Sequence, residues 1–181
     1  MSKTIIIIGA GLAGLSAALQ AAENGCNVKL VSSLPSERAQ SVMAEGGINA
    51  ALNTKDENDS PEEHFTDTIK AACGLADPNA VWGMTQAAPE LVHWLVKLGV
   101  KFNMSGYDDV DLRNFGGQKK KRTAFAQSDT GKQIMTAMID AVRRKEASGM
   151  VERFSHHSFL TLRLCDNICC GCVIRDEYSQ E

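Results

Sequence analysis

The chain opens with four consecutive isoleucines, followed by a segment in which leucine recurs at helical spacing. Leu12, Leu15 and Leu19 share one face of that segment, and Gly25 is placed to end it. A second apolar run covers residues 28–32. Strand, helix and strand in this order predict a βαβ unit whose first strand is buried on both faces of a parallel sheet.

This opening also has a second interpretation, because residues 5–22 are mostly apolar and follow a single basic side chain, Lys3. Such a stretch is found in signal peptides and in short membrane spans. Neither needs glycines at spacings of two and three, as at Gly9, Gly11 and Gly14. The βαβ interpretation explains them and is preferred.

Four helices are predicted between the first strands and the end of the chain. Ser60 followed by Pro61 and Glu63 is a capped start for the first of them. Its predicted buried face consists of Phe65, Ile69 and Cys73. Asp77 begins the second helix and Pro89 a separate third one. The fourth carries its apolar stripe at Ile134, Met138 and Val142.

Three further strands are predicted after the helices, at residues 151–154, 158–164 and 169–175. Asp166 and Asn167 join the last two strands as a hairpin turn. The predicted fold class is α/β, with a βαβ start, a helical insert and late antiparallel strands.

Composition excludes several classes of function. The 181 residues are 44% hydrophobic and carry a net charge of −3, so the chain is expected to be globular, without nucleic-acid or direct membrane partners. Six cysteines in a chain of this size, without a convincing export signal, favour reduced thiols in a cytoplasmic compartment.

The candidate chemistry begins at Gly9, Gly11 and Gly14, which form a G-x-G-x-x-G motif between a strand and a helix. In this context the first glycine makes a tight turn, the second lets a pyrophosphate approach the backbone, and the third lets helix and strand pack closely. An NAD site would place an acid after the second strand. The chain has Ser32 and Ser33 there, which disfavours a plain NAD site.

Two further segments carry a family resemblance. SSLPSERAQSVMAEGGINAAL (residues 32–52) and NFGGQKKKRTAFAQSDTGKQIMTAM (residues 114–138) resemble the flavoprotein subunit of succinate dehydrogenase and fumarate reductase. The resemblance implies a Rossmann-like FAD-binding domain that is incomplete at its C-terminus. Residues 1–181 would be its N-terminal portion, with the capping domain and the rest of the FAD domain absent.

The resemblance also implies the cofactor site. Gly46 and Gly47 would lie against the flavin ring, although a tight turn that needs backbone freedom remains an alternative. Ser32 would reach the adenosine ribose, and Ser158 or Phe159 would offer backbone hydrogen bonds to adenine. The complete set of predicted cofactor-binding residues is Gly9, Gly11, Leu12, Ala13, Gly14, Ser32, Ser33, Arg38, Gln40, Ser41, Ala44, Glu45, Gly46, Gly47, Ser158 and Phe159.

Phe115 and Glu45 are the predicted substrate-binding residues, since the family's F-G-G aromatic residue lines a dicarboxylate pocket. Ordinary core packing for Phe115 and a surface role for Glu45 remain alternatives. Relatives that attach FAD covalently have histidine where this chain has Gln40. The amide predicts noncovalent FAD and, as a hypothesis, a flavin potential that favours fumarate reduction.

Two remaining clusters are interpreted without a site. The cysteines of CDNICCGC (residues 165–172) match no common metal spacing and are interpreted as small apolar filler. KKKR (residues 119–122) is interpreted as solvated loop charge. No metal site is predicted, and none of the four histidines is predicted to be catalytic.

By resemblance, the chain is expected to be part of an enzyme that transfers hydride between flavin and a C4 dicarboxylate, fumarate or succinate. The catalytic residues are expected beyond residue 181, so this portion alone would be inactive. An L-aspartate oxidase and a non-catalytic FAD-binding or assembly fragment are the alternatives. An iron–sulfur or cytochrome electron-transfer subunit is the expected partner, with membrane attachment only through partners, at the inner face. The electron donor and the direction of flux stay open.

Overall fold

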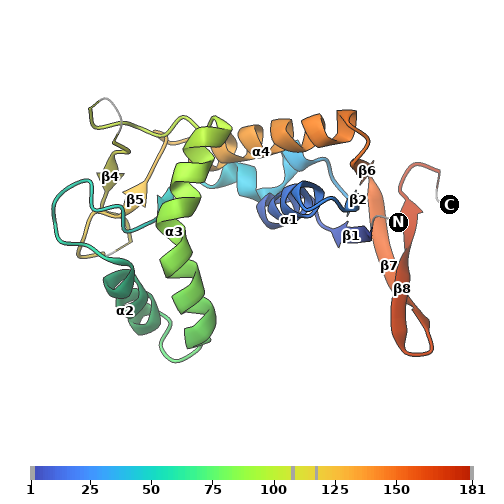
Figure 1. The fold of residues 1–181 in the computed structure, drawn as a ribbon, viewed down its shortest axis with the longest axis horizontal. Helices are drawn as coiled ribbons and strands as arrows, with labels where there is room; N and C mark the ends of the chain where they lie inside the picture. Colours follow the sequence, from blue (N-terminus) through green and yellow to red (C-terminus); the bar gives the residue numbers. More distant parts are fainter. Residues whose placement is uncertain (1–2, 107–108, 117, 180–181) are drawn as a thin grey trace. The chain divides into compact units, whose positions relative to one another are not determined.

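The computed structural model describes residues 3–106, 109–116 and 118–179 (Figure 1). The chain forms two compact units. We call residues 1–43 with 135–181 the sheet unit, and residues 44–134 the insert unit.

The sheet unit is built on three parallel strands in the order β1-β2-β6. Their bounds are Thr4–Ile8, Asn27–Ser32 and Val151–Ser155. Helix α1, Leu12–Glu23, connects the first two strands and buries Leu15, Ala18, Leu19 and Ala22. The βαβ start and the Gly25 turn, with φ of 77°, are confirmed. The prediction that the late strands are antiparallel is wrong for β6, which continues the parallel sheet beside β2.

The prediction that the first strand is buried on both faces is wrong. Ile5, Ile6 and Ile8 are 38%, 40% and 47% exposed. β1 is the edge strand of this sheet, with β2 as its neighbour on one side. Burial of both faces requires covering layers that a β-branched sequence cannot supply by itself.

A separate antiparallel hairpin completes the sheet unit and stands out as a long ribbon (Figure 1). Its strands are β7, His157–Cys165, and β8, Ile168–Asp176. Asp166 and Asn167 both have positive φ, 50° and 62°, as a two-residue type I′ turn requires. The predicted hairpin and its turn are confirmed.

The insert unit carries a pair of packed helices, α2 (Pro61–Ala71) and α3 (Pro78–Leu98). The Ser60 side chain accepts a hydrogen bond from the Glu63 backbone, so the predicted cap is confirmed. The predicted buried face is wrong at Cys73, which is exposed. Cys73 has a φ of 49° beyond the helix end, so its side chain leaves the helical stripe. His64 is the buried residue of α2 instead.

Pro89 does not begin a new helix but lies inside α3. Proline removes one backbone hydrogen bond from a helix interior. The buried face continues through both halves at Thr85, Ala88, Val92 and Leu95, and this packing keeps the helix continuous. The predicted start at Asp77 and stop at Gly99 are confirmed, the glycine being left-handed with φ of 107°.

A small antiparallel sheet, in the order β3-β5-β4, completes the insert unit. Its strands are Ile48–Asn49, Thr123–Ala124 and Leu112–Arg113. Two-residue strands leave no hydrophobic period in the sequence, so they were missed. Helix α4, Thr130–Ala147, begins in the insert unit and belongs to the sheet unit from Met135 onward. It buries Ile134, Met138 and Val142 as predicted. In the sheet unit, residues 36–38 and 40–43 form short 3-10 turns.

Candidate functional site

A cavity of about 570 Å³ lies at the end of the parallel sheet, within the sheet unit. Three stretches far apart in sequence meet there: the turn after β1, the segment after β2, and the start of β7. The lining residues are Ile8, Gly9, Ala10, Gly11, Ser32, Ser33, Leu34, Arg38, Ala39, Gln40, His157, Ser158 and Phe159. Eight of these were among the predicted cofactor residues, so the fold brings them together.

The three glycines of the motif differ in what requires them. Gly9 has a φ of 106°, which only glycine adopts easily. A Cβ on Gly14 would lie 1.8 Å from the Gly9 carbonyl oxygen, so packing of helix against turn excludes a side chain there. A Cβ on Gly11 would meet nothing closer than the Ser41 Oγ atom, at 3.5 Å. The protein itself therefore leaves room at Gly11, on the wall of the cavity.

Gly11 is also the N-cap of α1, so the helix begins at the cavity. The first backbone N–H groups of a helix have no partner within it, and the helix dipole makes this end positive. One of them, on Leu12, donates to Ser41 Oγ at 3.3 Å. The first turn carries no acidic side chain. This end of α1 is therefore suited to an anionic group, as the motif predicted.

The segment after β2 supplies polar and basic lining residues. Ser32 Oγ donates to the Leu34 carbonyl at 2.7 Å, which shapes the turn. Glu37, the nearest acid in this segment, faces Arg143 at 2.6 Å and does not line the cavity. No carboxylate from this segment reaches the cavity, in agreement with the argument against a plain NAD site.

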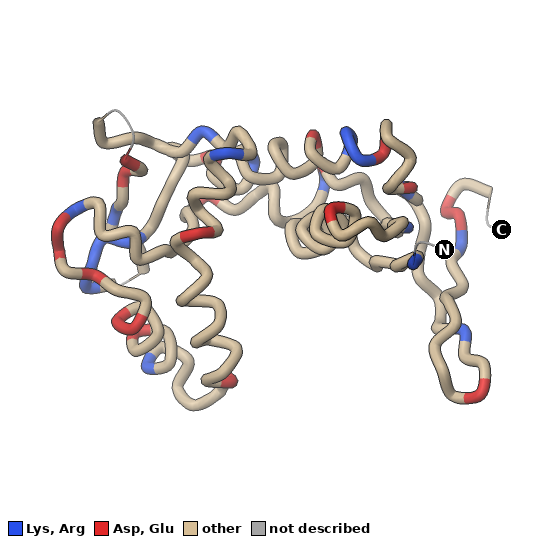
Figure 2. Tube along the Cα trace, viewed as in Figure 1, with Lys and Arg blue, Asp and Glu red and all other residues tan. Residues whose placement is uncertain are grey.

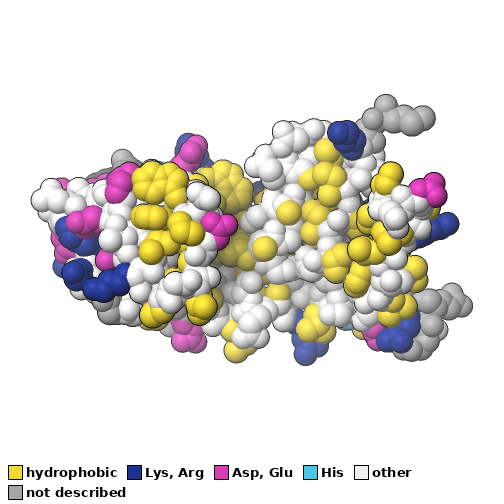
Figure 3. Space-filling view, turned by 90° about the horizontal axis from the view of Figure 1, so that it is seen from below, with side chains coloured by type: hydrophobic (Ala, Val, Ile, Leu, Met, Phe, Trp, Pro, Cys, Tyr) yellow, Lys and Arg dark blue, Asp and Glu magenta, His cyan; other side chains and the backbone are white. Residues whose placement is uncertain are grey.

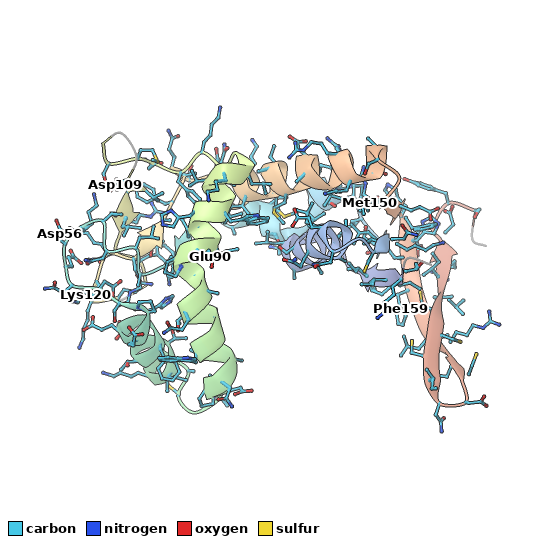
Figure 4. All side chains as sticks on the ribbon, in the orientation of Figure 1. Asp56, Glu90, Asp109, Lys120, Met150 and Phe159 are labelled. Atoms are coloured by element: carbon cyan, nitrogen blue, oxygen red, sulfur yellow. The ribbon has the colours of Figure 1, made fainter. Side chains whose placement is uncertain are left out.

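The start of β7 closes the third side of the cavity, with Ser158 and Phe159 in the lining. Phe159 is labelled on this strand in Figure 4. His157 lines it as well and was missed by sequence reasoning. Its Nδ1 atom lies 2.9 Å from the Ser155 carbonyl oxygen, which fixes the ring. Its position directly before Ser158 was the available signal.

The adjacent glycines at 46 and 47 lie in the insert unit, and protein atoms crowd both. A Cβ on Gly47 would come within 2.5 Å of the Ala124 carbonyl oxygen, and its φ is 112°. A Cβ on Gly46 would come within 2.9 Å of Phe115 Cζ. At Gly47 the positive φ supports the tight-turn alternative, and at Gly46 the Phe115 ring accounts for the missing side chain, so neither position requires a bound ring.

Arg113 holds this segment in place and was missed by sequence reasoning. Its Nη2 atom donates to the carbonyls of Glu45, at 3.2 Å, and Gly46, at 2.8 Å. Its guanidinium lies over the Phe125 ring, 4.5 Å from the centroid. The neighbouring Ala44 carbonyl accepts from the backbone N–H at position 131, at 2.6 Å. Of the F-G-G motif that suggested this region, Gly117 lies outside the described residues.

A family model described as an FAD binding domain matches residues 4–181. The chain belongs to this FAD-binding domain family. The predicted membership of an FAD-binding family, the α/β fold and the FAD cofactor are thereby confirmed, and the room at Gly11 and the positive end of the α1 dipole fit such a cofactor.

Three relatives of this FAD-binding domain refine the comparison. The succinate dehydrogenase flavoprotein subunit of Bacillus subtilis is 44% identical over 172 residues, which cover 95% of the chain and 29% of that protein. An L-aspartate oxidase of Streptomyces coelicolor is 34% identical over 146 residues, 80% of the chain and 25% of that protein. The Mycobacterium smegmatis Sdh1 complex contains a chain that matches with a TM-score of 0.89 at 30% identity, over 96% of this chain and 30% of that one.

This FAD-binding domain thus spans less than a third of the length of these relatives. Among its described residues, no helix combines the length and apolar character needed to cross a bilayer.

The FAD-binding domain also contains a buried ion cluster that corrects the interpretation of KKKR. Arg122 is fully buried, and its Nη2 atom lies 2.8 Å from Asp59 Oδ1 and 3.1 Å from Asp67 Oδ2. Lys120 pairs with Glu63 of α2, and Lys121 pairs with Glu57 of the loop before that helix. Basic and acidic segments lie close together in this part of the insert unit (Figure 2). The prediction of solvated charge is therefore wrong for Arg122. This residue directly precedes the buried strand β5, so its side chain lies in the core of the insert unit.

Burial shifts the pKa values of two side chains in and beside this cluster, Asp59 and His64. Loss of solvent raises the pKa of Asp59 above its ordinary value, against the opposing effect of Arg122. Burial, together with the charge of Arg122, lowers the pKa of His64. His64 is therefore held neutral beside a permanent positive charge.

The cysteines of residues 165–172 are not apolar filler, since Cys165, Cys169 and Cys170 are exposed on the hairpin. Among the described residues, no group of three or more His, Cys, Asp or Glu side chains could hold a metal ion. The hairpin also exposes Leu160, Leu162, Leu164 and Ile168, and its hydrophobic surface is visible in Figure 3.

Proposed function

We propose that this FAD-binding domain is the cofactor-binding part of a flavoprotein of the succinate dehydrogenase and fumarate reductase type. The observation that carries the proposal is the cavity of the sheet unit, where three separate stretches bring the predicted adenosine-binding and diphosphate-binding residues together. The 44% identity to a succinate dehydrogenase flavoprotein subunit supports the reaction type.

In this proposal each wall of the cavity has a task. The N-terminus of α1, beginning after Gly11, holds the diphosphate with its helix dipole and backbone N–H groups. Arg38, which also lines the cavity, adds positive charge. Ser32 and Ser33 bind the ribose, and the backbone at Ser158 and Phe159 binds adenine.

The insert unit would supply the flavin and substrate side. Ala44, Glu45 and Gly47 are exposed, and Phe115 is 52% exposed beside Gly46. We propose that the backbone of Gly46 and Gly47 faces the flavin, and that Phe115 and Glu45 contribute to the dicarboxylate pocket. Arg113 would keep that backbone fixed by holding two of its carbonyls.

When bound, FAD supplies the two-electron chemistry, accepting a hydride from succinate or returning one to fumarate. The proposed role of this chain is to bind and orient the cofactor. Noncovalent attachment follows from Gln40, which lines the cavity with an amide that cannot form the histidine–flavin bond. We further propose an electron-transfer partner subunit and a cytoplasmic location, at the membrane only through such partners.

Activity of the full protein tests the proposal. Succinate oxidation or fumarate reduction with an artificial electron carrier is expected, and acid precipitation should release all of the flavin. Absence of both activities in a flavin-loaded protein would overturn the proposed reaction. Flavin that stays with the acid precipitate would contradict the argument from Gln40.

L-aspartate oxidase is a second candidate, because a relative with that activity is 34% identical over 80% of the chain. The two enzymes differ in the substrate that reduces the flavin. Anaerobic bleaching of the flavin absorbance by L-aspartate, but not by succinate, would favour the oxidase. The reverse pattern is expected.

A further inference from the structure

Two thiols meet on the β7–β8 hairpin of the sheet unit, away from the residues that line the cavity. The Sγ atoms of Cys165 and Cys170 lie 2.7 Å apart. A disulfide bond is about 2.04 Å long, so a movement of less than about 1 Å would join these sulfurs. Both side chains are exposed, and reagents in solution can reach them.

The hairpin backbone accounts for this proximity. Cys165 is the last residue of β7 and pairs with Ile168 across the turn, while Leu164 pairs with Cys169. The next pair is Arg163 with Gly171, so Cys170 is an extra residue in β8, a β-bulge. A bulge re-aims the side chain of its extra residue. The register therefore turns the Cys170 thiol toward the end of β7.

The two sulfurs are not equivalent. Cys170 S–H donates to the Arg163 carbonyl oxygen at 3.3 Å, a contact that requires the protonated thiol. Its hydrogen bond with Cys165 raises the pKa of Cys170 above the ordinary value. The Cys170 thiol is held by the Arg163 carbonyl, and we therefore assign the first attack to Cys165.

Other thiols of the hairpin have different surroundings. Cys169 Sγ donates to the Gly171 carbonyl oxygen at 3.6 Å, and Cys172 is half-buried. A metal would need more ligands than two thiols, and the described residues offer no group of three or more. Redox chemistry between two neighbouring sulfurs needs only that pair.

We propose that Cys165 and Cys170 form a reversible disulfide with low-molecular-weight disulfides as the oxidant. The Cys165 thiolate attacks one sulfur of the oxidant, forms a mixed disulfide and releases one small thiolate. Cys170 then loses its proton and displaces the second small thiolate from Cys165. The two cysteines lose two electrons and two protons, and the oxidant is reduced to two thiols.

The experiment exposes the purified protein to glutathione disulfide, blocks remaining thiols with N-ethylmaleimide and identifies disulfides by mass spectrometry. Cleavage before Asp166 and Asp176 leaves Cys165 in one peptide and the other three cysteines of the hairpin together in the next, and fragmentation of the linked pair identifies the partner of Cys165. The expected result is a linked pair of peptides that dithiothreitol separates. Failure to form this link, or a link from Cys165 to Cys169 or Cys172, would overturn the proposal.

Matched serine variants sharpen the test, because each replacement is nearly isosteric and lies on an exposed hairpin. Cys170→Ser should stop at the glutathione adduct on Cys165, and Cys165→Ser should abolish the link. Cys169→Ser should leave the link intact, and circular dichroism should show the same fold for all three. A link that persists in Cys170→Ser would contradict the assignment.

Discussion

The ring of Phe115 occupies the space that a side chain on residue 46 would need, with Cζ 2.9 Å from a Cβ built on Gly46. These two residues lie in separate predicted motifs, and the fold of the insert unit brings them into contact. At Gly47 the obstacle is different, since the Ala124 carbonyl of β5 stands 2.5 Å from the corresponding Cβ. A side chain at residue 46 would therefore meet a ring that can move, whereas a side chain at residue 47 would meet a backbone that cannot.

This difference predicts unequal costs for two alanine substitutions. Gly46→Ala should lower the free energy of unfolding by less than about 1 kcal/mol, because the half-exposed Phe115 ring can move aside. Gly47→Ala should cost at least about 1–3 kcal/mol, because its positive φ and the β5 backbone both resist a side chain. Urea unfolding of the two variants measures the difference, and equal costs would refute it.

The buried Arg122 predicts a second stability effect. Arg122→Met leaves Asp59 buried without its partner and should cost about 3–5 kcal/mol in the free energy of unfolding. The double variant Arg122→Met/Asp59→Leu should recover most of that loss, since the buried unpaired charge is gone and Asp67, the other partner of Arg122, is 35% exposed. The exposed Lys119→Met is the matched control, expected within about 0.5 kcal/mol of the parent. A double variant as unstable as the single one would contradict the account.

His64 predicts a pH dependence. Its folded-state pKa is lowered, whereas the unfolded chain protonates it near about 6.5, so stability present above that pH is lost as the pH falls through it. The charged groups that act on it are Arg122 and Asp67. Asp59, whose folded-state pKa is raised, contributes the opposite sign at lower pH.

Comparison of the parent with His64→Gln isolates this group. Between about pH 7.5 and about pH 5.5 the parent should lose more unfolding free energy than the variant does. Parallel stability profiles for the two proteins would show that His64 is not held neutral.

Local sequence signals predicted the ends of helices and the hairpin turn correctly, because each of these positions needs a particular residue type for one local physical reason. Ser60, Asp77, Gly99 and the Asp166-Asn167 turn marked element ends correctly because capping and positive φ are local demands. Pro89 misled because the packing of α3 outweighs one lost hydrogen bond. The predicted burial of β1 was wrong because burial depends on covering layers of structure, which the local sequence pattern does not determine.

The residues of the candidate site likewise divide into those that the sequence predicts and those that only the fold reveals. The spacing of Gly9, Gly11 and Gly14 predicted their place in the site, and the family resemblance predicted that of Ser158. Arg113 could not be predicted, because its hydrogen bonds go to two backbone carbonyls that lie more than sixty residues away in the sequence. Arg122 was misjudged for a related reason, since a basic run in sequence does not reveal which member points into the core.

The central claim is that the end of α1, at Gly11, holds the diphosphate of FAD. Titration of the flavin-free protein with FAD, followed by flavin fluorescence, tests this most directly for the parent and for Gly11→Ala. The added methyl meets no protein atom closer than 3.5 Å, so the thermal unfolding midpoint should stay unchanged. The account predicts FAD affinity at least about tenfold weaker in the variant, or about 1.4 kcal/mol. Equal affinity of the two proteins would contradict it.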